Sequence, residues 1–228
     1  MGGEMVSFKS NGHDAQGYLA VPASARGSGV IVIQEWWGLV PHIKDVADRF
    51  AAAGFVALAP DLYHGKSATE PDEAGKLMMA MNIAEAEREL HGAINFLAAH
   101  PAVSSKKVGT VGFCMGGTLS LFAAAHNPEK VGACVIFYGG HPSVIVDLKE
   151  LAAPVLGLYA GNDHLATPER ARELEADLKA HGKLAELHIY PGVDHAFFND
   201  ARPEVYNREA SADAWRRTVE FLNKNLSQ

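Results

Sequence analysis

The sequence predicts an α/β fold in which a mostly parallel central sheet is flanked by helices. Strand-like and helix-like patterns alternate over most of the 228 residues, which is typical of a parallel sheet covered by helices. Several strand-like runs are apolar at nearly every position, as expected of strands buried on both faces. The length suits one domain and no break in composition separates two, so residues 1–228 are expected to form a single domain.

The first half of the chain is predicted to hold a hairpin, two buried strands and the longest helix. Pro60 ends a strand and Pro101 ends a helix, because proline lacks the N–H group that continues either structure. The expected elements are a hairpin over residues 5–9 and 16–21, strands over 29–34 and 55–59, a helix over 42–53, a loop over 61–72, and one long helical region over about 73–100.

The second half alternates more regularly between strands and helices. Thr167 is expected to cap the start of a helix with its hydroxyl group, and Gly182 to end the same helix. The expected elements are strands over residues 108–112, 132–138, 154–159 and 185–190, and helices over 118–126, 168–181 and within 206–225.

The composition excludes several classes of partner. The net charge is −7 and the basic residues are scattered, unlike those of a nucleic-acid-binding surface. No apolar run reaches the ~20 residues of a membrane span, and the first residues do not resemble a signal peptide. The two cysteines form neither a disulfide framework nor a zinc motif. We expect a cytoplasmic protein without metal or cofactor, a monomer or small homo-oligomer that binds neither nucleic acid nor membrane.

The most specific motif joins the strand over residues 108–112 to the helix that follows it. Its sequence is Gly112-Phe113-Cys114-Met115-Gly116, the Gly-x-nucleophile-x-Gly pattern of a nucleophile elbow, with cysteine in the place usually held by serine. A nucleophile on so tight a turn has strained dihedral angles, so its neighbours must be nearly free of side chain. The motif therefore predicts that Cys114 is a nucleophile beside the start of a helix.

A cysteine nucleophile needs an imidazole to take its proton, and the imidazole needs a third group to orient it. Asp163 follows the strand over residues 154–159, and His195 follows the strand over residues 185–190. The carboxyl ends of parallel strands carry the sites of α/β folds. Chain order and position therefore predict a triad of Cys114, His195 and Asp163.

Other interpretations of these residues stay open. Asp163 can be a turn residue, and Asp194 can be either a rival acid or a turn former. His164 can line the site or merely neighbour Asp163 in sequence. Cys134 lies within a predicted strand and is not part of a glycine elbow. We expect it to pack in the core.

A second motif, Gln34-Glu35-Trp36-Trp37-Gly38, ends the first central strand. This fold position usually supplies an oxyanion-hole N–H group, so the backbone N–H groups of Trp36 and Met115 are the expected pair. A carboxylate that closes an apolar strand needs a buried partner or a function. Glu35 is thus either in a salt bridge with a nearby arginine or a second acid–base group. Trp36 and Trp37 either line an apolar pocket or pack in the core.

Taken together, the motifs resemble the dienelactone hydrolase family (carboxymethylenebutenolidase-like, in the α/β-hydrolase superfamily) over essentially the whole chain. The resemblance rests on Gln34 to Gly38, Ala59-Pro60-Asp61-Leu62-Tyr63, Gly112 to Gly117, Gly161-Asn162-Asp163, and Tyr190 to Phe197. It implies an α/β-hydrolase fold without a large lid domain. It also implies a carboxylic ester hydrolase that cleaves a small ester or lactone through a cysteine acyl-enzyme, with Cys114, His195 and Asp163 as its triad.

The resemblance further implies roles around the triad. Glu35 would accept the thiol proton once substrate binding frees its carboxylate. The expected pocket residues are Trp37, Tyr63, His164, Phe197 and Asn199, although Tyr63 can equally be a packed loop residue.

The chain departs from the family in the residues that bind the substrate carboxylate. Dienelactone hydrolases use two arginines, one of them four residues after the catalytic histidine, where this chain has Asn199. No arginine occurs from Gly65 to Ala86, the region of the other. A lysine does not replace a bidentate guanidinium, so dienelactone itself is a doubtful substrate. The alternative function is a non-catalytic protein that binds a small ligand on the same scaffold.

Overall fold

The central sheet of the described residues has eight strands, six of which form one continuous parallel block. The computed structural model describes residues 2–10 and 12–226, and within them the strand order is β1-β2-β4-β3-β5-β6-β7-β8. β1 and β2 pair antiparallel, as do β2 and β4, and every later pair is parallel. The strands are β1 (Glu4–Ser10), β2 (His13–Ala20), β3 (Gly29–Ile33), β4 (Val56–Pro60), β5 (Val108–Phe113), β6 (Val131–Phe137), β7 (Val155–Ala160) and β8 (Ala185–Tyr190).

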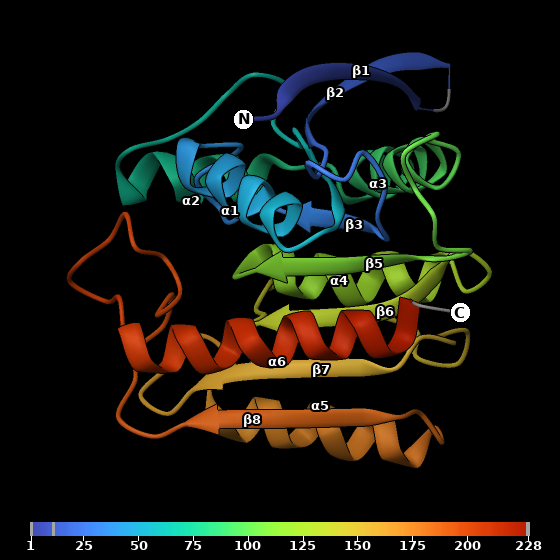
Figure 1. The fold of residues 1–228 in the computed structure, drawn as a ribbon. Coiled ribbons are helices and arrows are strands. Elements are labelled where there is room, and N and C mark those ends of the chain that lie inside the picture. Colours follow the sequence, from blue (N-terminus) through green and yellow to red (C-terminus); the bar gives the residue numbers. More distant parts are fainter. Residues whose placement is uncertain (1, 11, 227–228) are drawn as a thin grey trace.

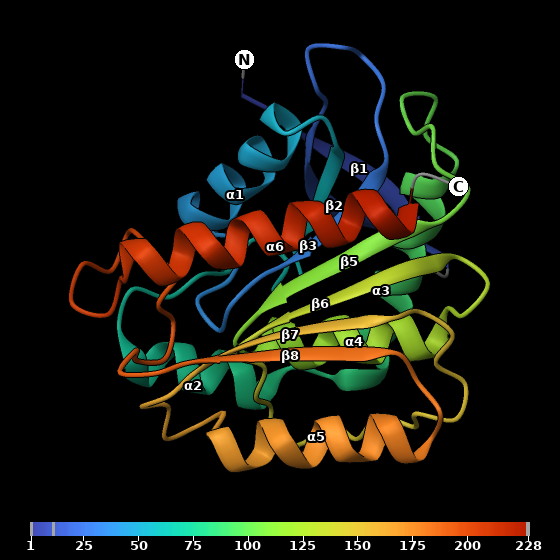
Figure 2. The same ribbon diagram turned by 60° about the horizontal axis from the view of Figure 1, so that its bottom comes forward.

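Helices cover both faces of the sheet (Figures 1 and 2). α1 and α6 lie on one face, and α3, α4 and α5 lie on the other. β3, β4 and β5 are buried at every position, which is why their sequences are nearly continuous apolar runs. The helices are α1 (Pro41–Ala52), α2 (Pro71–Ala80), α3 (Ile83–Ala98), α4 (Met115–His126), α5 (Pro168–Ala180) and α6 (Arg208–Leu226). The predicted α/β-hydrolase fold is confirmed.

The carboxyl ends of the parallel strands meet at one edge of the molecule. In Figure 1 the arrowheads of β5 and β8 point left, toward the side where α2 and the loop before α6 lie. Loops from distant parts of the sequence therefore come together at this edge.

The long helix expected over residues 73–100 is wrong, because the structure contains two helices there. α2 ends at Ala80, and Met81 has an extended backbone. The Oδ1 atom of Asn82 then accepts a hydrogen bond from the Glu85 N–H group, at 3.2 Å, and caps α3. α2 also begins at Pro71, inside the segment expected to be a loop, because proline is well suited to the first position of a helix.

The helix after the elbow begins earlier than expected. We predicted it over residues 118–126, but α4 starts at Met115, directly after Cys114. Further along, Thr167 caps α5 through a hydrogen bond from the Arg170 N–H group, as predicted. Gly182 follows the end of α5 with a φ of +68°.

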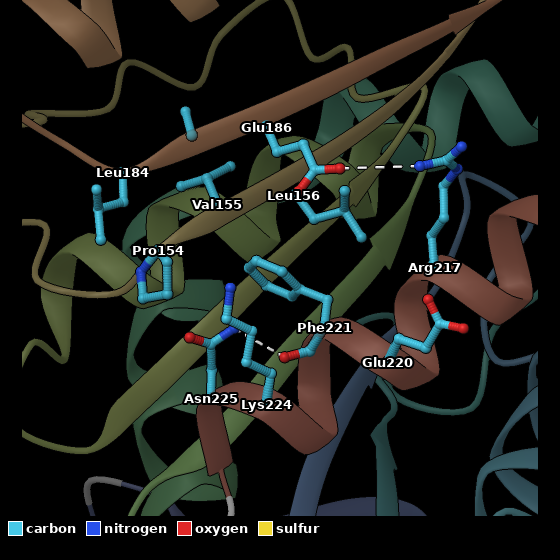
Figure 3. A pocket seen from close by; sticks show the side chains of 11 residues that line it. Pro154, Val155, Leu156, Leu184, Glu186, Arg217, Glu220, Phe221, Lys224 and Asn225 are labelled. Atoms are coloured by element: carbon cyan, nitrogen blue, oxygen red, sulfur yellow. Dashed lines mark hydrogen bonds and ion pairs between the residues drawn. The ribbon is translucent and has the colours of Figure 1, made fainter.

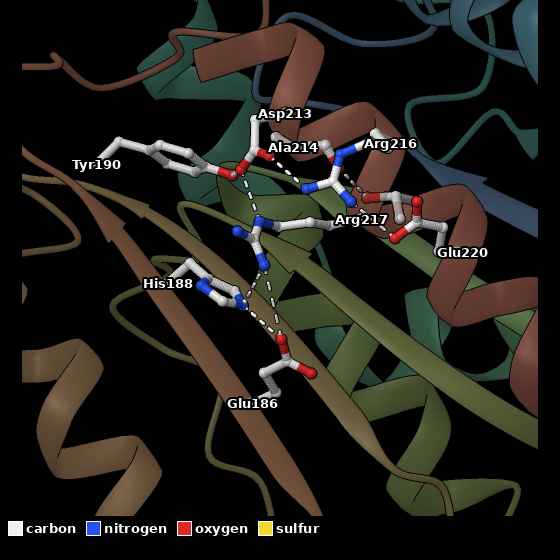
Figure 4. A network of polar contacts seen from close by, with 9 residues as sticks. Glu186, His188, Tyr190, Asp213, Ala214, Arg216, Arg217 and Glu220 are labelled. Carbon is white, nitrogen blue, oxygen red and sulfur yellow. Dashed lines mark hydrogen bonds and ion pairs between the residues drawn. The ribbon is translucent and has the colours of Figure 1, made fainter. Parts of the chain in front are cut away.

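A network of polar side chains fixes α6 to the edge strand β8 (Figure 4). Tyr190 and Arg217 both donate hydrogen bonds to Asp213, at 3.0 and 2.6 Å. Arg217 also lies 3.2 Å from His188 and 3.8 Å from Glu186. The bond from Arg217 holds the pKa of the Asp213 carboxyl well below its usual range. The network thus braces the strand that precedes the His195 loop. Among the described residues, no helix is long and apolar enough to span a membrane.

Candidate active site

Cys114 lies at the tip of a strained turn between β5 and α4. Its backbone has φ 55° and ψ −122°, a conformation that non-glycine residues rarely adopt and that recurs at functional sites. The turn is anchored because the Cys114 N–H group donates to the Phe137 carbonyl at 3.1 Å. The side chain is almost covered, with 9% of the residue exposed.

The glycines of the motif are required by close backbone packing. A Cβ atom on Gly112 would lie 1.8 Å from the Gly116 carbonyl oxygen. A Cβ atom on Gly116 would lie 2.4 Å from the Gln34 carbonyl oxygen. No side chain fits at either position, so the glycines allow the elbow to form against β3.

The three residues predicted as a triad come together at the carboxyl edge of the sheet. Nδ1 of His195 lies 2.6 Å from Oδ2 of Asp163. The other oxygen, Oδ1, accepts the N–H groups of Leu165 and Ala166, at 2.8 and 2.9 Å. Asp163 is thus fully bonded and fixes the imidazole ring with Nε2 pointing away from it.

The electrostatics of this group favour a charged imidazole. Burial lowers the pKa of His195, because it disfavours the charged imidazolium. The Asp163 carboxylate and the Cys114 sulfur have a larger, opposite effect, and the pKa of His195 is raised to about 10. Nε2 of His195 is buried and has no regular hydrogen bond in the described structure. After Asp163, the Cys114 sulfur is the group that most favours the charged form of this ring.

The backbone N–H groups of Trp36 and Met115 remain the candidates for an oxyanion hole. Met115 is the first residue of α4, and N–H groups in the first turn of a helix have no partner within the helix. Trp36 follows Glu35 in the loop after β3 and lines the same cavity as Cys114. This pair is suited to bind a negatively charged oxygen.

Glu35 is buried and its hydrogen-bond partners are neutral. It is 1% exposed, and its Oε2 accepts a bond from Asn199 Nδ2 at 2.6 Å. Its Oε1 accepts a longer bond from the Tyr138 hydroxyl at 3.5 Å. Among the described residues no arginine forms a salt bridge with it, so that interpretation of Glu35 is wrong. Burial raises the pKa of Glu35, while the charge of His42 and the bond from Asn199 oppose the shift.

Tyr138 connects two of these residues and was not predicted. It follows β6 with a φ of +39°, a strained value for a residue with a side chain. Its ring packs edge-on against His195, with 5.0 Å between centroids, and its hydroxyl reaches Glu35. Its position directly after β6, at the carboxyl end of a parallel strand, is the sequence signal that points to it.

A cavity of about 550 Å³ opens onto Cys114, His195 and Glu35. Trp36 and Trp37 both line it, and Trp36 also packs against the hydrophobic core. Its remaining lining residues are Met78, Gly140, His141, Pro142, Leu165, Arg170, Ala196 and Arg202. The cavity is thus mostly apolar, with a reactive group at one wall, as in a small-molecule site.

Four predicted pocket residues lie outside this lining. The Tyr63 hydroxyl donates to Met115 Sδ at 3.3 Å, beneath the elbow. Phe197 is fully buried, and His164 is exposed. Asn199 is buried behind Glu35, which it binds. Of the predicted pocket residues only Trp37 contacts the cavity, because the others are directed into the core or solvent.

Two arginines line the cavity at positions that differ from those expected in the family. Arg170 comes from the first turn of α5, where it also donates to the Leu165 carbonyl at 3.3 Å. The Arg202 guanidinium lies 5.5 Å from the ring centroid of Trp37 and pairs with Glu204. Positions along the chain do not indicate these two arginines, because their side chains reach the cavity from α5 and from the loop before α6.

A second cavity, of about 440 Å³, lies at the opposite ends of the strands (Figure 3). It is formed at the beginnings of β7 and β8 and along α6, with Glu186, Arg217 and Lys224 among its polar residues. Its lining contains no cysteine, histidine, serine or threonine. We therefore place the active site at the first cavity.

One group of described side chains has the spacing of a metal site, and it lies elsewhere. The ligand atoms of His13, Glu85 and Glu89 are within 4.8 Å of one another, on β2 and α3. Glu89 is already paired with His64 at 2.6 Å. None of these residues lines the cavity beside Cys114.

Comparison with known proteins gives one consistent family. A sequence model described as "Dienelactone hydrolase family" matches residues 15–226. The chain is 39% identical to "Protein usf" of Aquifex pyrophilus, over 99% of this chain and 100% of that protein. It is 36% identical to a "Putative carboxymethylenebutenolidase" of Aquifex aeolicus, over 98% of this chain and 99% of that protein.

The solved structures agree in fold. A "Putative Dienelactone Hydrolase" from Klebsiella pneumoniae superposes with a TM-score of 0.88 and 30% identity, over 97% of this chain and 98% of the other. An "alpha/beta hydrolase enzyme" from a deep-sea metagenome library superposes with a TM-score of 0.71 at 15% identity, over 100% of this chain and 99% of the other. At that identity the second comparison shows the fold alone.

Proposed function

The chain belongs to the dienelactone hydrolase family and is a hydrolase, and from that premise we propose that it cleaves a small ester or lactone through an acyl-enzyme on Cys114. His195 and Asp163 complete the triad. The observation that carries the proposal is the joint geometry of the site. A strained elbow cysteine and a histidine oriented by a buried aspartate face one apolar cavity.

In the first half of the reaction the Cys114 thiolate attacks the carbonyl carbon and forms an S–C bond. The resulting oxyanion is bound by the N–H groups of Trp36 and Met115. When the intermediate collapses, the C–O bond to the leaving group breaks and His195 donates its proton to the departing oxygen. The products are a thioester and an alcohol, which stay in one molecule if the substrate is a lactone.

In the second half a water molecule attacks the thioester. His195 takes a proton from the water, a tetrahedral intermediate forms again, and its collapse breaks the S–C bond. The acid leaves, and the thiolate returns beside a protonated His195. Asp163 holds the same imidazole orientation through both halves of the reaction.

Glu35 is proposed as the group that exchanges a proton with the resting thiol. It lines the cavity together with Cys114, and its raised pKa moves it from an ordinary carboxyl toward the range of a general base. Asn199 and Tyr138 hold its two oxygens. Substrate entering the cavity would disturb these bonds and release the carboxylate toward the sulfur.

A thiol nucleophile also fits the reducing cytoplasm.

Arg170 and Arg202 supply positive charge to a cavity that otherwise has mostly apolar walls. A substrate carrying a carboxylate is therefore compatible with this cavity, although its anion would be bound from other positions than in the family. The substrate panel for this protein should accordingly contain a neutral activated ester, the same ester with a terminal carboxylate, and a lactone.

The test is a comparison of Cys114→Ser with wild-type protein on this panel. We expect kcat/KM to fall at least ~100-fold, because the hydroxyl group is a much weaker nucleophile than the thiolate at neutral pH. The melting temperature should barely change, since the two side chains are similar in size. Cys134→Ala is the matched control, because Cys134 is a fully buried cysteine outside the cavity, and it should retain activity. Full activity in Cys114→Ser would overturn the proposed mechanism.

A further inference from the structure

Two consecutive residues of the loop before α6 connect Glu35 to a second buried histidine. Asn199 donates its hydrogen bond to Glu35 Oε2 at 2.6 Å. The next residue, Asp200, contacts His42 in the first turn of α1, with 3.2 Å between Oδ1 and Nδ1. One short segment therefore fixes the positions of both Glu35 and His42.

His42 is a buried histidine, and only one of its two ring nitrogens has a hydrogen-bond partner among the described residues. Its side chain is 2% exposed, and its Nδ1 pairs with Asp200, which is paired in turn with Arg49. Its other nitrogen, Nε2, is buried without a hydrogen-bond partner among the described residues. Burying an unsatisfied polar atom costs roughly 1–3 kcal/mol. An apolar side chain would fill this position without that cost, so packing alone does not explain a histidine here.

The surroundings of Glu35 suggest that explanation. If Glu35 is to accept the thiol proton, it must first be ionised, and a buried carboxylate needs a compensating charge. Asn199 and Tyr138 provide hydrogen bonds but no positive charge. The charged or titratable groups that act on Glu35 are His42, His195, Arg202 and Tyr138, with the Cys114 thiol in the same cavity.

Of His42, His195 and Arg202, only His42 lies outside both the triad and the cavity lining. His195 is bonded to Asp163 and acts on the Cys114 sulfur. Arg202 is 34% exposed at its side chain and pairs with Glu204. His42 is nearly unexposed, and charges interact more strongly at buried positions than at the surface.

We propose that His42, oriented by Asp200, is a positioning residue that supplies the compensating charge for the Glu35 carboxylate. The inference rests on the proposed role of Glu35 as the acceptor of the thiol proton. In the resting protein the imidazolium of His42 stabilises the ionised form of Glu35. When the thiol proton moves to Glu35, the carboxyl becomes neutral and the need for that charge disappears. His42 thus sets how readily Glu35 can act, without itself contacting substrate.

The experiment measures the rate at which iodoacetamide alkylates Cys114 as a function of pH. Wild-type protein should show a step in this profile that Glu35→Gln lacks. His42→Asn keeps an N–H donor for Asp200 but cannot carry a charge. It should move the midpoint of the step to higher pH by about one unit, the order of the effect of an opposite charge nearby. Asp200→Asn should move it in the same direction.

The controls separate this proposal from a purely structural role. His91→Asn removes a histidine from α3, where its partner is Asn127, and should leave the midpoint unchanged. A structural role for His42 would lower the melting temperature or the rate at every pH but would not shift the midpoint. If His42→Asn does not fold, Asp200→Asn makes the same test.

Two results would overturn the inference, and they differ in what else they overturn. A Glu35-dependent step whose midpoint is unmoved in His42→Asn and Asp200→Asn would reject His42 as the compensating charge and leave Glu35 in its role. A wild-type profile without any Glu35-dependent step would reject the role of Glu35 itself. Loss of Cys114 alkylation in Cys114→Ala confirms in either case that the reaction is followed at the correct sulfur.

Discussion

At the scale of single residues, the site depends on how completely Asp163 is bonded. Its carboxylate receives two backbone N–H groups and the His195 imidazole, and its side chain is fully covered. The bonds from His195 and from the backbone lower the pKa of Asp163 against the opposing effect of burial. The lowered pKa favours the carboxylate form of Asp163, whose negative charge orients His195.

This pair predicts a specific pH dependence of stability. Because the pKa of His195 is raised from 6.5 to about 10, its imidazolium stabilises the folded protein fully below about pH 6.5. That contribution is lost as the pH rises toward 10. Asp163→Asn should therefore cost about 2 kcal/mol of unfolding free energy near pH 5.5, the order of a hydrogen bond to a charged group.

Denaturant unfolding of wild type and Asp163→Asn, near pH 5.5 and again near pH 9.5, measures this difference. The account requires the difference to shrink at the higher pH. A difference that grows toward alkaline pH would show that His195 is not held in its charged form.

The residues that could be predicted from the sequence are those that the backbone alone positions. Cys114, Asp163 and His195 each follow a strand, so the order of the strands was enough to bring them together. Arg170 and Arg202 reach the cavity through long side chains from α5 and from a loop. Their positions depend on loop conformations that periodicity does not encode.

At the scale of elements, the break between α2 and α3 shows where sequence reasoning failed. The helical period runs through residues 73–98 without a proline or glycine at the break, so periodicity alone predicted one helix. Asn82 with Glu85 three residues later is nevertheless a helix-start signal, since an asparagine caps well and an acidic residue suits the first turn. The break has a consequence for the site, because α2 carries Met78 to the wall of the cavity.

The geometry of the elbow predicts that alanine at Gly112 costs more stability than alanine at a glycine in an open loop. Gly112→Ala should cost at least ~3 kcal/mol or prevent folding, because the new methyl group would overlap backbone atoms that cannot move apart. Gly182→Ala should cost only about 1 kcal/mol, since its φ of +68° is unfavourable for alanine but no heavy atom lies within 4 Å of the added carbon.

Chemical denaturation of the two variants compares these costs directly. Similar losses in both would mean that the close approach of Gly112 to Gly116 does not determine the fold of the elbow. Activity of a folded Gly112→Ala protein should also be low, because Cys114 could not keep its strained backbone.

At the scale of the whole molecule, the site is assembled from segments far apart in sequence. The order of strands places the ends of β3, β5, β6, β7 and β8 side by side, and each contributes a residue of the site. The network between α6 and β8 braces the last of these strands (Figure 4). The loop leading into α6 contacts Glu35 through Asn199. The alternation of strands and helices predicted this architecture, whereas burial of Glu35 behind Asn199 depends on one loop.

The central claim is that hydrolysis proceeds through an acyl group on Cys114, and intact-mass spectrometry after acid quenching tests it most directly. Wild type, Cys114→Ala and His195→Asn would each be incubated briefly with an activated nitrophenyl ester from the substrate panel. The good leaving group needs no protonation, so His195→Asn can still be acylated but lacks the base that activates water. We predict an added mass equal to the acyl group on the intact protein, accumulating most in His195→Asn and missing in Cys114→Ala. Turnover without an adduct in any of the three proteins, or an equal adduct in Cys114→Ala, would contradict the account.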